Sequence, residues 1–259
     1  MRRYAVVRNN WRRNNWRRWA LSAVALLLAA IPAAAQIPDQ FTNLQVLPKD
    51  IGKPQLVELM RAFATGLGVR CDHCHAGEPT PDLSKMDFAS DVKEAKKTAR
   101  LMLQMVRAIN GDYLAKLGHE HKIRVECVTC HRGVTEPETV SSLLAEVIEE
   151  KGAEAAVARY RELRSKYYGS GSYDFSDRPL NGLGETLLKE KKAPEAVAVL
   201  ELNAEFHPES AYNCYLLGEA YLARGDKEKA KASFQKAVEL DPQNPRPRKR
   251  LEELNKLPS

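Results

Sequence analysis

The chain has 259 residues, of which 44% are hydrophobic and 29% are charged. Its formal net charge of +6 depends on seven arginines between Arg2 and Arg18, a segment without acidic residues. Without those arginines, 33 basic residues face 34 acidic ones, so the basic character belongs to the N-terminus and gives no reason to expect nucleic-acid binding.

The N-terminus has the three parts of a secretory signal peptide. The arginine-rich segment is followed by an apolar run, Leu21–Ala30, and by an A-x-A pattern that ends at Ala35. We therefore expect residues 1–35 to be a signal peptide and the mature protein to be periplasmic. The apolar run is short and alanine-rich for a spanning helix, so we expect membrane association only if the leader is retained as an anchor.

Two five-residue segments, 71–75 and 127–131, carry the pattern C-x-x-C-H. This is the attachment signature of c-type haem: two thiols bind the porphyrin covalently and the histidine binds the iron. The sequence therefore predicts two covalently bound haem c groups. The predicted attachment residues are Cys71, Cys74, Cys127 and Cys130, and the predicted proximal iron ligands are His75 and His131.

Paired cysteines have two other interpretations. A redox-active disulfide of the thioredoxin type requires a strand before the motif and a helix after it, and no such pattern surrounds either pair. A four-cysteine zinc site would leave the histidine after each pair unexplained. The fifth cysteine, Cys214, has no partner if both haems are attached, and we expect it to be a small buried apolar side chain.

The segment before the first motif predicts a helix over about 53–65. Pro54 suits its first turn, and Gly66 and Gly68 end it. Met60 lies at the centre of the apolar face, 11 residues before Cys71. Methionine is a common sixth ligand of c-type haem, but a core methionine is the alternative.

A second helix is predicted over about 88–109, ending at Asn110-Gly111. Its apolar stripe contains Met102, with Met105 beside it, and the spacing to the second motif does not choose between them as a ligand. The opposite face is expected to be a solvated polar surface. It carries Lys93, Glu94, Lys96 and Lys97.

The C-terminal half contains a repeat with an offset of 34 residues. Leu183-Gly184, Ala196 and Pro208 recur as Leu217-Gly218, Ala230 and Pro242, in the spacing of tetratricopeptide repeats. A weaker unit precedes them over 142–168, and a short capping helix is expected after residue 245. We predict an all-α protein: a dihaem cytochrome c domain over 38–136, then a tetratricopeptide-like domain over 137–259.

The haem-binding half resembles the cytochrome c subunit of photosynthetic reaction centres. The resemblance covers about 90 residues, from Leu47-Pro48-Lys49-Asp50 through the Met60 helix and both motifs. It implies a helical methionine as the sixth ligand of each haem, and Met60 and Met105 match those positions. Met102 is an alternative, as is His119, which matches a histidine that ligates a fourth haem in the four-haem members of the family.

The leading functional hypothesis is a periplasmic dihaem electron carrier whose repeat domain docks redox partner proteins. The rival is a peroxidase-like enzyme with one closed and one open haem iron, which the presence of a methionine for each haem disfavours. An assembly factor in which the repeats act and the haems sense redox state is a third hypothesis, but no motif is specific to it.

Overall fold

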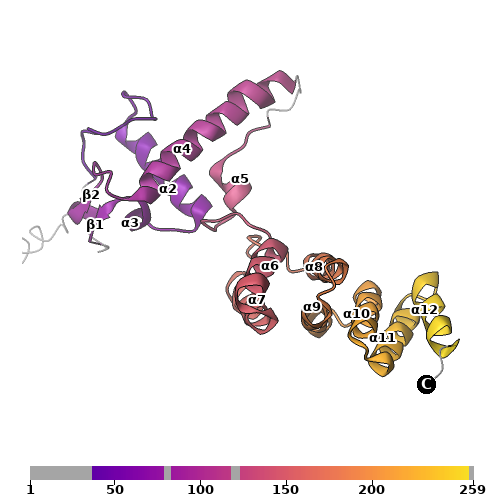
Figure 1. Cartoon of the computed structure of the whole chain (residues 1–259). Coiled ribbons are helices and arrows are strands. Elements are labelled where there is room, and N and C mark those ends of the chain that lie inside the picture. The colour runs from indigo at the N-terminus through magenta and orange to yellow at the C-terminus, as the bar shows by residue number, and fades with distance from the viewer. Residues whose placement is uncertain (1–36, 79–82, 118–122, 257–259) are drawn as a thin grey trace, which may run out of the picture. The chain divides into compact units, whose positions relative to one another are not determined.

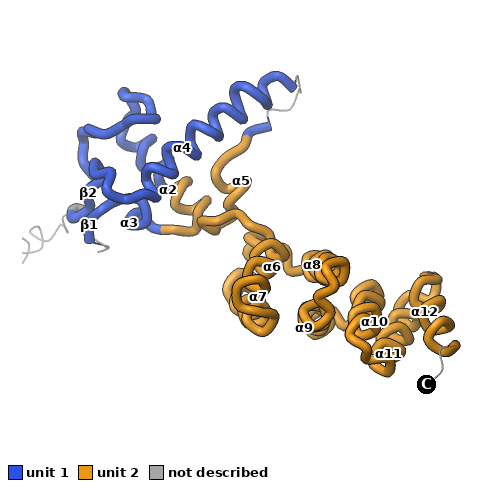
Figure 2. The backbone as a smooth tube through the Cα atoms, in the orientation of Figure 1, with its two compact units in different colours: residues 1–61, 70–124 blue, residues 62–69, 125–259 orange. Residues whose placement is uncertain are grey.

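The computed structural model describes residues 37–78, 83–117 and 123–256. These residues form two compact units (Figure 2), divided at 61/62, 69/70 and 124/125. Unit 1 contains the first C-x-x-C-H segment, and unit 2 contains the second segment together with all the repeat helices. The predicted signal peptide and His119 lie outside the described residues. Within the described ranges, no helix has both the length and the apolar character needed to cross a membrane.

Unit 1 is built from short helices and one minimal hairpin (Figure 1). Helix α2 starts in this unit and ends in unit 2, and the two-residue strands β1 and β2 pair antiparallel, with Ala76 opposite Asp87 and Gly77 opposite Met86. The elements are α2 (Lys53–Leu67), α3 (Cys71–Cys74), β1 (Ala76–Gly77), the 3-10 turn η1 (Leu83–Lys85), β2 (Met86–Asp87), α4 (Glu94–Ala108), the π turn η2 (Ile109–Tyr113) and the 3-10 turn η3 (Leu114–Leu117).

The second predicted helix differs from the structure at both ends. Helix α4 begins at Glu94 rather than near Phe88, because the Asp87 carboxylate accepts hydrogen bonds from the backbone N–H groups of Ala89 and Ser90 (3.0 and 2.9 Å) and holds a turn there. At the other end, the chain does not stop at Asn110-Gly111 but continues as the π turn η2.

Unit 2 carries three antiparallel helix pairs and a final single helix, which confirms the predicted all-α repeat architecture (Figure 1). Helix α5 (Cys127–His131) precedes them. The pairs are α6 (Val140–Lys151) with α7 (Ala153–Tyr167), α8 (Asp177–Lys189) with α9 (Ala193–Phe206), and α10 (Ala211–Arg224) with α11 (Lys227–Leu240); α12 (Pro245–Lys256) follows.

The repeat glycines are needed because the paired helices approach closely. A β-carbon on Gly184 would lie 2.6 Å from the Leu200 side chain, and one on Gly218 would lie 2.5 Å from the Phe234 ring. Leu200 and Phe234 are fully buried in the unit's core. Cys214 is also buried, as expected.

Buried amides fix the register between the second and third helix pairs. The Asn203 Nδ2 group donates to the Asp177 carbonyl (2.9 Å), to Asn181 Oδ1 (2.9 Å) and to Asn213 Oδ1 (3.1 Å). Asn213 in turn donates to the Leu200 carbonyl (3.2 Å). Each of these polar groups is costly to bury without a partner, so the network favours one packing arrangement of α8, α9 and α10.

Candidate haem-binding sites

The first motif folds as a single helical turn, α3, that packs against α4. Residues three apart on a helix share a face, so Cys71 and Cys74 present their sulfur atoms on the same side. Cys71 is exposed and Cys74 is half-buried. Lys93, one residue before α4, donates a hydrogen bond to the Asp72 carbonyl and ties the two elements together. This arrangement suits attachment of one porphyrin through both thiols.

His75 follows the turn in an extended conformation, and its ring is held edge-on against Phe88. The ring centroids are 5.1 Å apart with an interplanar angle of 65°. Its Nδ1 atom is buried and has no hydrogen-bond partner in the described part of the chain. A buried ring nitrogen without a hydrogen-bond partner lowers the stability of the folded chain.

Burial lowers the pKa of His75 below its ordinary value, and the positive charge of Lys96 lowers it further. The main chain of Phe88 lies close enough to oppose this shift in part, but without the geometry of a hydrogen bond. The lowered pKa favours the neutral imidazole, which is the form that binds iron.

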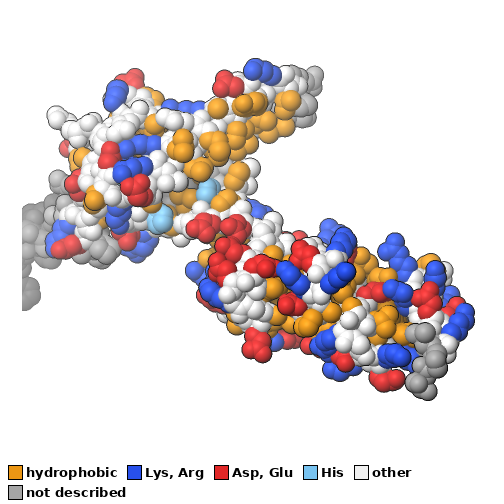
Figure 3. All heavy atoms as spheres, viewed as in Figure 1, with side chains coloured by type: hydrophobic (Ala, Val, Ile, Leu, Met, Phe, Trp, Pro, Cys, Tyr) orange, Lys and Arg blue, Asp and Glu red, His pale blue; other side chains and the backbone are white. Residues whose placement is uncertain are grey.

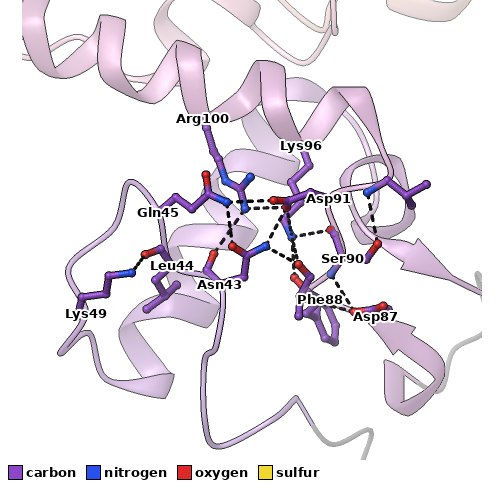
Figure 4. Close-up of polar contacts among 12 residues, drawn as sticks. Asn43, Leu44, Gln45, Lys49, Asp87, Phe88, Ser90, Asp91, Lys96 and Arg100 are labelled. Carbon is purple, nitrogen blue, oxygen red and sulfur yellow. Dashed lines mark hydrogen bonds and ion pairs between the residues drawn. The ribbon is translucent and has the colours of Figure 1, made fainter.

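Phe88, whose ring contacts His75, is held in place by the buried side chain of Lys96 (Figure 4). Lys96 is only 8% exposed, and its ammonium group donates to the carbonyl oxygens of Phe88 (2.9 Å), Ala89 (3.1 Å) and Ser90 (2.7 Å). It also pairs with Asp91 at 3.1 Å. The prediction that Lys96 belongs to a solvated face was therefore wrong: its side chain folds back to satisfy the carbonyl groups of the turn before α4.

Asp91 is the centre of this polar cluster (Figure 4). Its Oδ1 atom accepts hydrogen bonds from Arg100 (2.8 Å) and Asn43 (2.9 Å), and Oδ2 accepts one from Gln45 (3.0 Å). The Arg100 and Asn43 hydrogen bonds, with Lys96 close by, hold the pKa of the Asp91 carboxyl well below its usual range. The cluster connects residues 43–45 to α4, the helix that carries Met102 and Met105, and so helps to hold that helix in place.

The second motif is also a short helix, α5, and its start is held by Glu126 and Thr129. The Glu126 N–H donates to Thr129 Oγ1 (3.0 Å), and the Thr129 N–H donates to the Glu126 carbonyl (3.0 Å). Cys127 is half-buried and Cys130 is exposed, three residues apart on the same turn. Both motifs thus place a cysteine pair on one face of one helical turn.

His131 has the hydrogen bond that an iron-binding histidine normally has. Its Nδ1 atom lies 3.0 Å from the carbonyl oxygen of Val134, and Val134 is 7% exposed. A histidine that donates Nδ1–H to a backbone carbonyl presents the Nε2 lone pair to a metal, and such a bond fixes both the tautomer and the ring orientation. The arrangement is therefore suited to Nε2 ligation.

A tight bend after His131 makes this bond possible. Arg132 has φ +48° and Gly133 has φ +87°, both in the left-handed region. The Gly133 N–H donates to the Gly66 carbonyl at the end of α2 (2.9 Å). Gly68 is required there, since its φ is +66° and a β-carbon would lie 2.1 Å from the Gly133 carbonyl oxygen.

The candidate methionine ligands lie on two helices. Met60 is half-buried on α2, in the same unit as the first motif. Met102 and Met105 are 37% and 46% exposed on α4, and the neighbouring Leu101 is 63% exposed. Met105 belongs to unit 1 and the second motif to unit 2. Figure 3 shows the apolar side chains gathered along α4.

Large apolar side chains that are 37–63% exposed among the described residues suit contact with a porphyrin, which is itself a large apolar surface. Together with the two cysteine pairs and the orientation of His131, they show a donor set and a surface suited to haem c. Sequence reasoning missed Phe88, Lys96 and the Val134 carbonyl, because no periodicity or motif marks a ring contact, a folded-back lysine or a main-chain acceptor.

The fold and these sites define a c-type cytochrome. More narrowly, the chain belongs to the photosynthetic reaction centre cytochrome c subunit family, whose model matches residues 17–194. A tetratricopeptide repeat model matches residues 211–244. Membership implies covalently bound haem c, and it replaces the thioredoxin and zinc interpretations of the cysteine pairs.

Two curated relatives support the assignment. The photosynthetic reaction center cytochrome c subunit of Thermochromatium tepidum is 32% identical over 126 residues, which is 48% of this chain and 28% of that protein. Cytochrome c-554 of Chloroflexus aurantiacus is 34% identical over 90 residues, 34% of this chain and 20% of that protein. The chain thus spans less than a third of the length of either relative.

Proposed function

We propose that this protein is an exported dihaem cytochrome c that carries single electrons between protein partners. The observation that carries the proposal is the pair of C-x-x-C-H segments, each folded around one helical turn and each with its histidine held by local structure: His75 by the Phe88 ring and His131 by the Val134 carbonyl. When bound, each haem supplies a one-electron ferric/ferrous couple. The protein's part is to attach the groups, orient the histidines and supply the sixth ligands.

The proposed axial pairs are His75 with Met60 and His131 with Met105. Met60 shares a compact unit with its motif, while Met105 lies on the partly exposed apolar side of α4, with Met102 and His119 as the alternatives. A thioether sulfur stabilises the ferrous state relative to a second histidine and so raises the reduction potential. With both pairs in place, the irons would have no open position for a substrate, and this favours a carrier over a peroxidase-like enzyme.

We assign one function to each predicted domain: export to the signal peptide 1–35, haem binding to 38–136 and partner docking to the repeat domain 137–259. The repeat domain would dock a redox partner protein in the periplasm. Exposed aromatic side chains support this, since aromatic residues are enriched in protein interfaces. On the repeats, Tyr168 is 66% exposed, and Tyr212 is 38% exposed and stacks on Tyr215 at 6.2 Å.

The test is the absorption spectrum of the purified holoprotein in both oxidation states, with and without carbon monoxide. Two low-spin haems, a methionine-to-ferric-iron band and no carbon monoxide shift are expected of a carrier. A high-spin component that binds carbon monoxide would overturn the proposal in favour of the enzyme with one open iron.

Cysteine variants test the number of haems. Replacing Cys71 and Cys74 with serine, or Cys127 and Cys130 with serine, should each remove one covalent haem from the denatured protein's mass. Cys214→Ser is the matched control and should remove none, because Cys214 is buried in α10 within the repeat core. A protein that keeps its full haem mass in either double variant would contradict the dihaem assignment.

A further inference from the structure

We propose that Ser172, in the loop after the first helix pair of the repeat domain, is a positioning residue for the second haem's proximal ligand. The inference rests on the proposed role of His131 as that ligand. All the residues that carry it belong to unit 2.

The central observation is a hydrogen bond between residues 40 positions apart. The Ser172 hydroxyl donates to the Arg132 carbonyl at 2.7 Å, and Ser172 is only 4% exposed. Arg132 is the residue directly after His131 and adopts the left-handed conformation that starts the bend. A backbone carbonyl in that position has no helical partner, so the serine satisfies it from outside the motif.

The bend is therefore held from two sides. Ser172 binds the Arg132 carbonyl, and the Gly66 carbonyl accepts the Gly133 N–H at 2.9 Å. Between them the chain turns back so that the Val134 carbonyl reaches His131 Nδ1 at 3.0 Å. If either support is removed, the carbonyl that orients the histidine is less well fixed.

The loop that carries Ser172 is itself anchored in the repeat core. Gly169 and Gly171 have φ values of 79° and 80°, which permit its tight path. The ring of Tyr173 packs against Tyr167 at 5.3 Å and against Phe175 at 6.1 Å. Phe175 is 7% exposed and belongs to the core of the helix pairs. Ser172 thus connects that core to the turn beside the iron ligand.

The chemical consequence concerns the strength of the hydrogen bond between His131 Nδ1 and the Val134 carbonyl. A strong hydrogen bond makes the imidazole a better electron donor to iron, which stabilises the ferric state and lowers the reduction potential. Loss of the Ser172 hydroxyl should loosen the bend, weaken that bond and shift the second haem to a more positive potential. The first haem, in unit 1, should keep its potential.

The experiment is a redox titration of holoprotein carrying Ser172→Ala, with the two haems resolved. The expected result is a positive shift at one haem, no change at the other, and reversal of the shift in Ser172→Thr, which keeps the hydroxyl donor. Ser210→Ala is the matched control: it removes a serine that donates to Asp177 at 2.6 Å within the repeats, away from the motif, and should leave both potentials unchanged.

The outcomes separate this inference from the proposed function. Unchanged potentials in Ser172→Ala, with both haems attached and low-spin, would overturn the positioning role and leave the electron carrier intact. Equal shifts at both haems, or the same shift in Ser210→Ala, would also overturn it. A protein without a low-spin second haem before any substitution would overturn the proposed function itself.

Discussion

At the scale of single residues, the two proposed proximal histidines are held in different ways. His131 has a main-chain acceptor for Nδ1, whereas the Nδ1 of His75 is buried without one among the described residues, and its ring packs against Phe88. A hydrogen bond at Nδ1 makes the ligand more basic, so the two sites give the iron different donors even with the same sixth ligand. We therefore expect two distinct potentials, with the His75 site the more positive.

The proposed role of Met60 as an iron ligand can be tested by truncating its side chain. Met60→Ala should lower one of the two midpoint potentials, because loss of the thioether removes the ligand that stabilises ferrous iron, and should leave the other nearly unchanged. Redox titration followed by absorption checks this. Met86→Ala is the control, since Met86 is a buried methionine of the same unit, 8% exposed and in the β hairpin. Equal shifts at both haems would count against Met60.

The choice between the two methionines of α4 needs a paired comparison. Met105→Ala should remove about half of the methionine-to-ferric-iron band and open the second iron to carbon monoxide, while Met102→Ala should do neither. The two side chains have similar exposure, 46% and 37%, so the loss of apolar surface is matched. The reverse outcome would assign the ligand to Met102, and an unchanged band in both variants would point to His119.

At the scale of elements, the turn before α4 shows what sequence patterns leave out. The repeat helices could be predicted because small residues recur at the positions where Gly184 meets Leu200 and Gly218 meets Phe234. The start of α4 could not be predicted, because it depends on the turn that the Asp87 carboxylate and Lys96 hold before the helix. The helical pattern places Lys96 on a polar face, and it does not indicate that the ammonium group will bind the carbonyl groups of the preceding turn.

Lys96 should matter more to stability than its neighbour. Lys96→Met removes the donor to three carbonyl groups in a nearly buried position, and we expect a loss of about 2–4 kcal/mol in the free energy of unfolding. Lys97→Met is the control, since Lys97 makes an exposed pair with Glu94 that is worth about 0.5 kcal/mol or less. Denaturant unfolding followed by circular dichroism measures both. Equal losses would show that Lys96 does not hold the turn.

The Asp91 cluster predicts how stability depends on pH. Its folded pKa lies below the unfolded one, so its contribution is complete above about pH 4 and is lost as the pH falls toward the lower folded pKa. In Asp91→Asn, the free energy of unfolding should therefore fall less between pH 7 and pH 3 than in the unmodified protein, as measured by urea unfolding at both pH values. Asp39→Asn, which removes an exposed carboxylate paired with Lys53, is the charge-matched control. If the variant Asp91→Asn loses as much stability between pH 7 and pH 3 as the unmodified protein, the role of the cluster is contradicted.

At the scale of the whole molecule, each compact unit contains one of the two C-x-x-C-H motifs, and the repeats belong to the same unit as the second motif. The motifs and the 34-residue offset predict a boundary near residue 136, whereas the second motif lies in one compact unit with the repeats. The reason lies in contacts between distant segments: Ser172 with Arg132, and Gly66 with Gly133. Pairings of this kind leave no periodic trace, so they could not be predicted from the sequence.

This division predicts that the second haem and the repeats unfold together. Gly218→Ala places a carbon 2.5 Å from the fully buried Phe234 ring and should destabilise the repeats by about 1–3 kcal/mol. During denaturant unfolding, the helical signal and the loss of ligation at the second haem should both move to lower denaturant, while the first haem keeps its midpoint. Gly182→Ala, which meets open space on α8, is the control and should be neutral or slightly stabilising. If Gly218→Ala shifts the helical signal but not the second haem, the motif is independent of the repeats, and the link through Ser172 carries no energy.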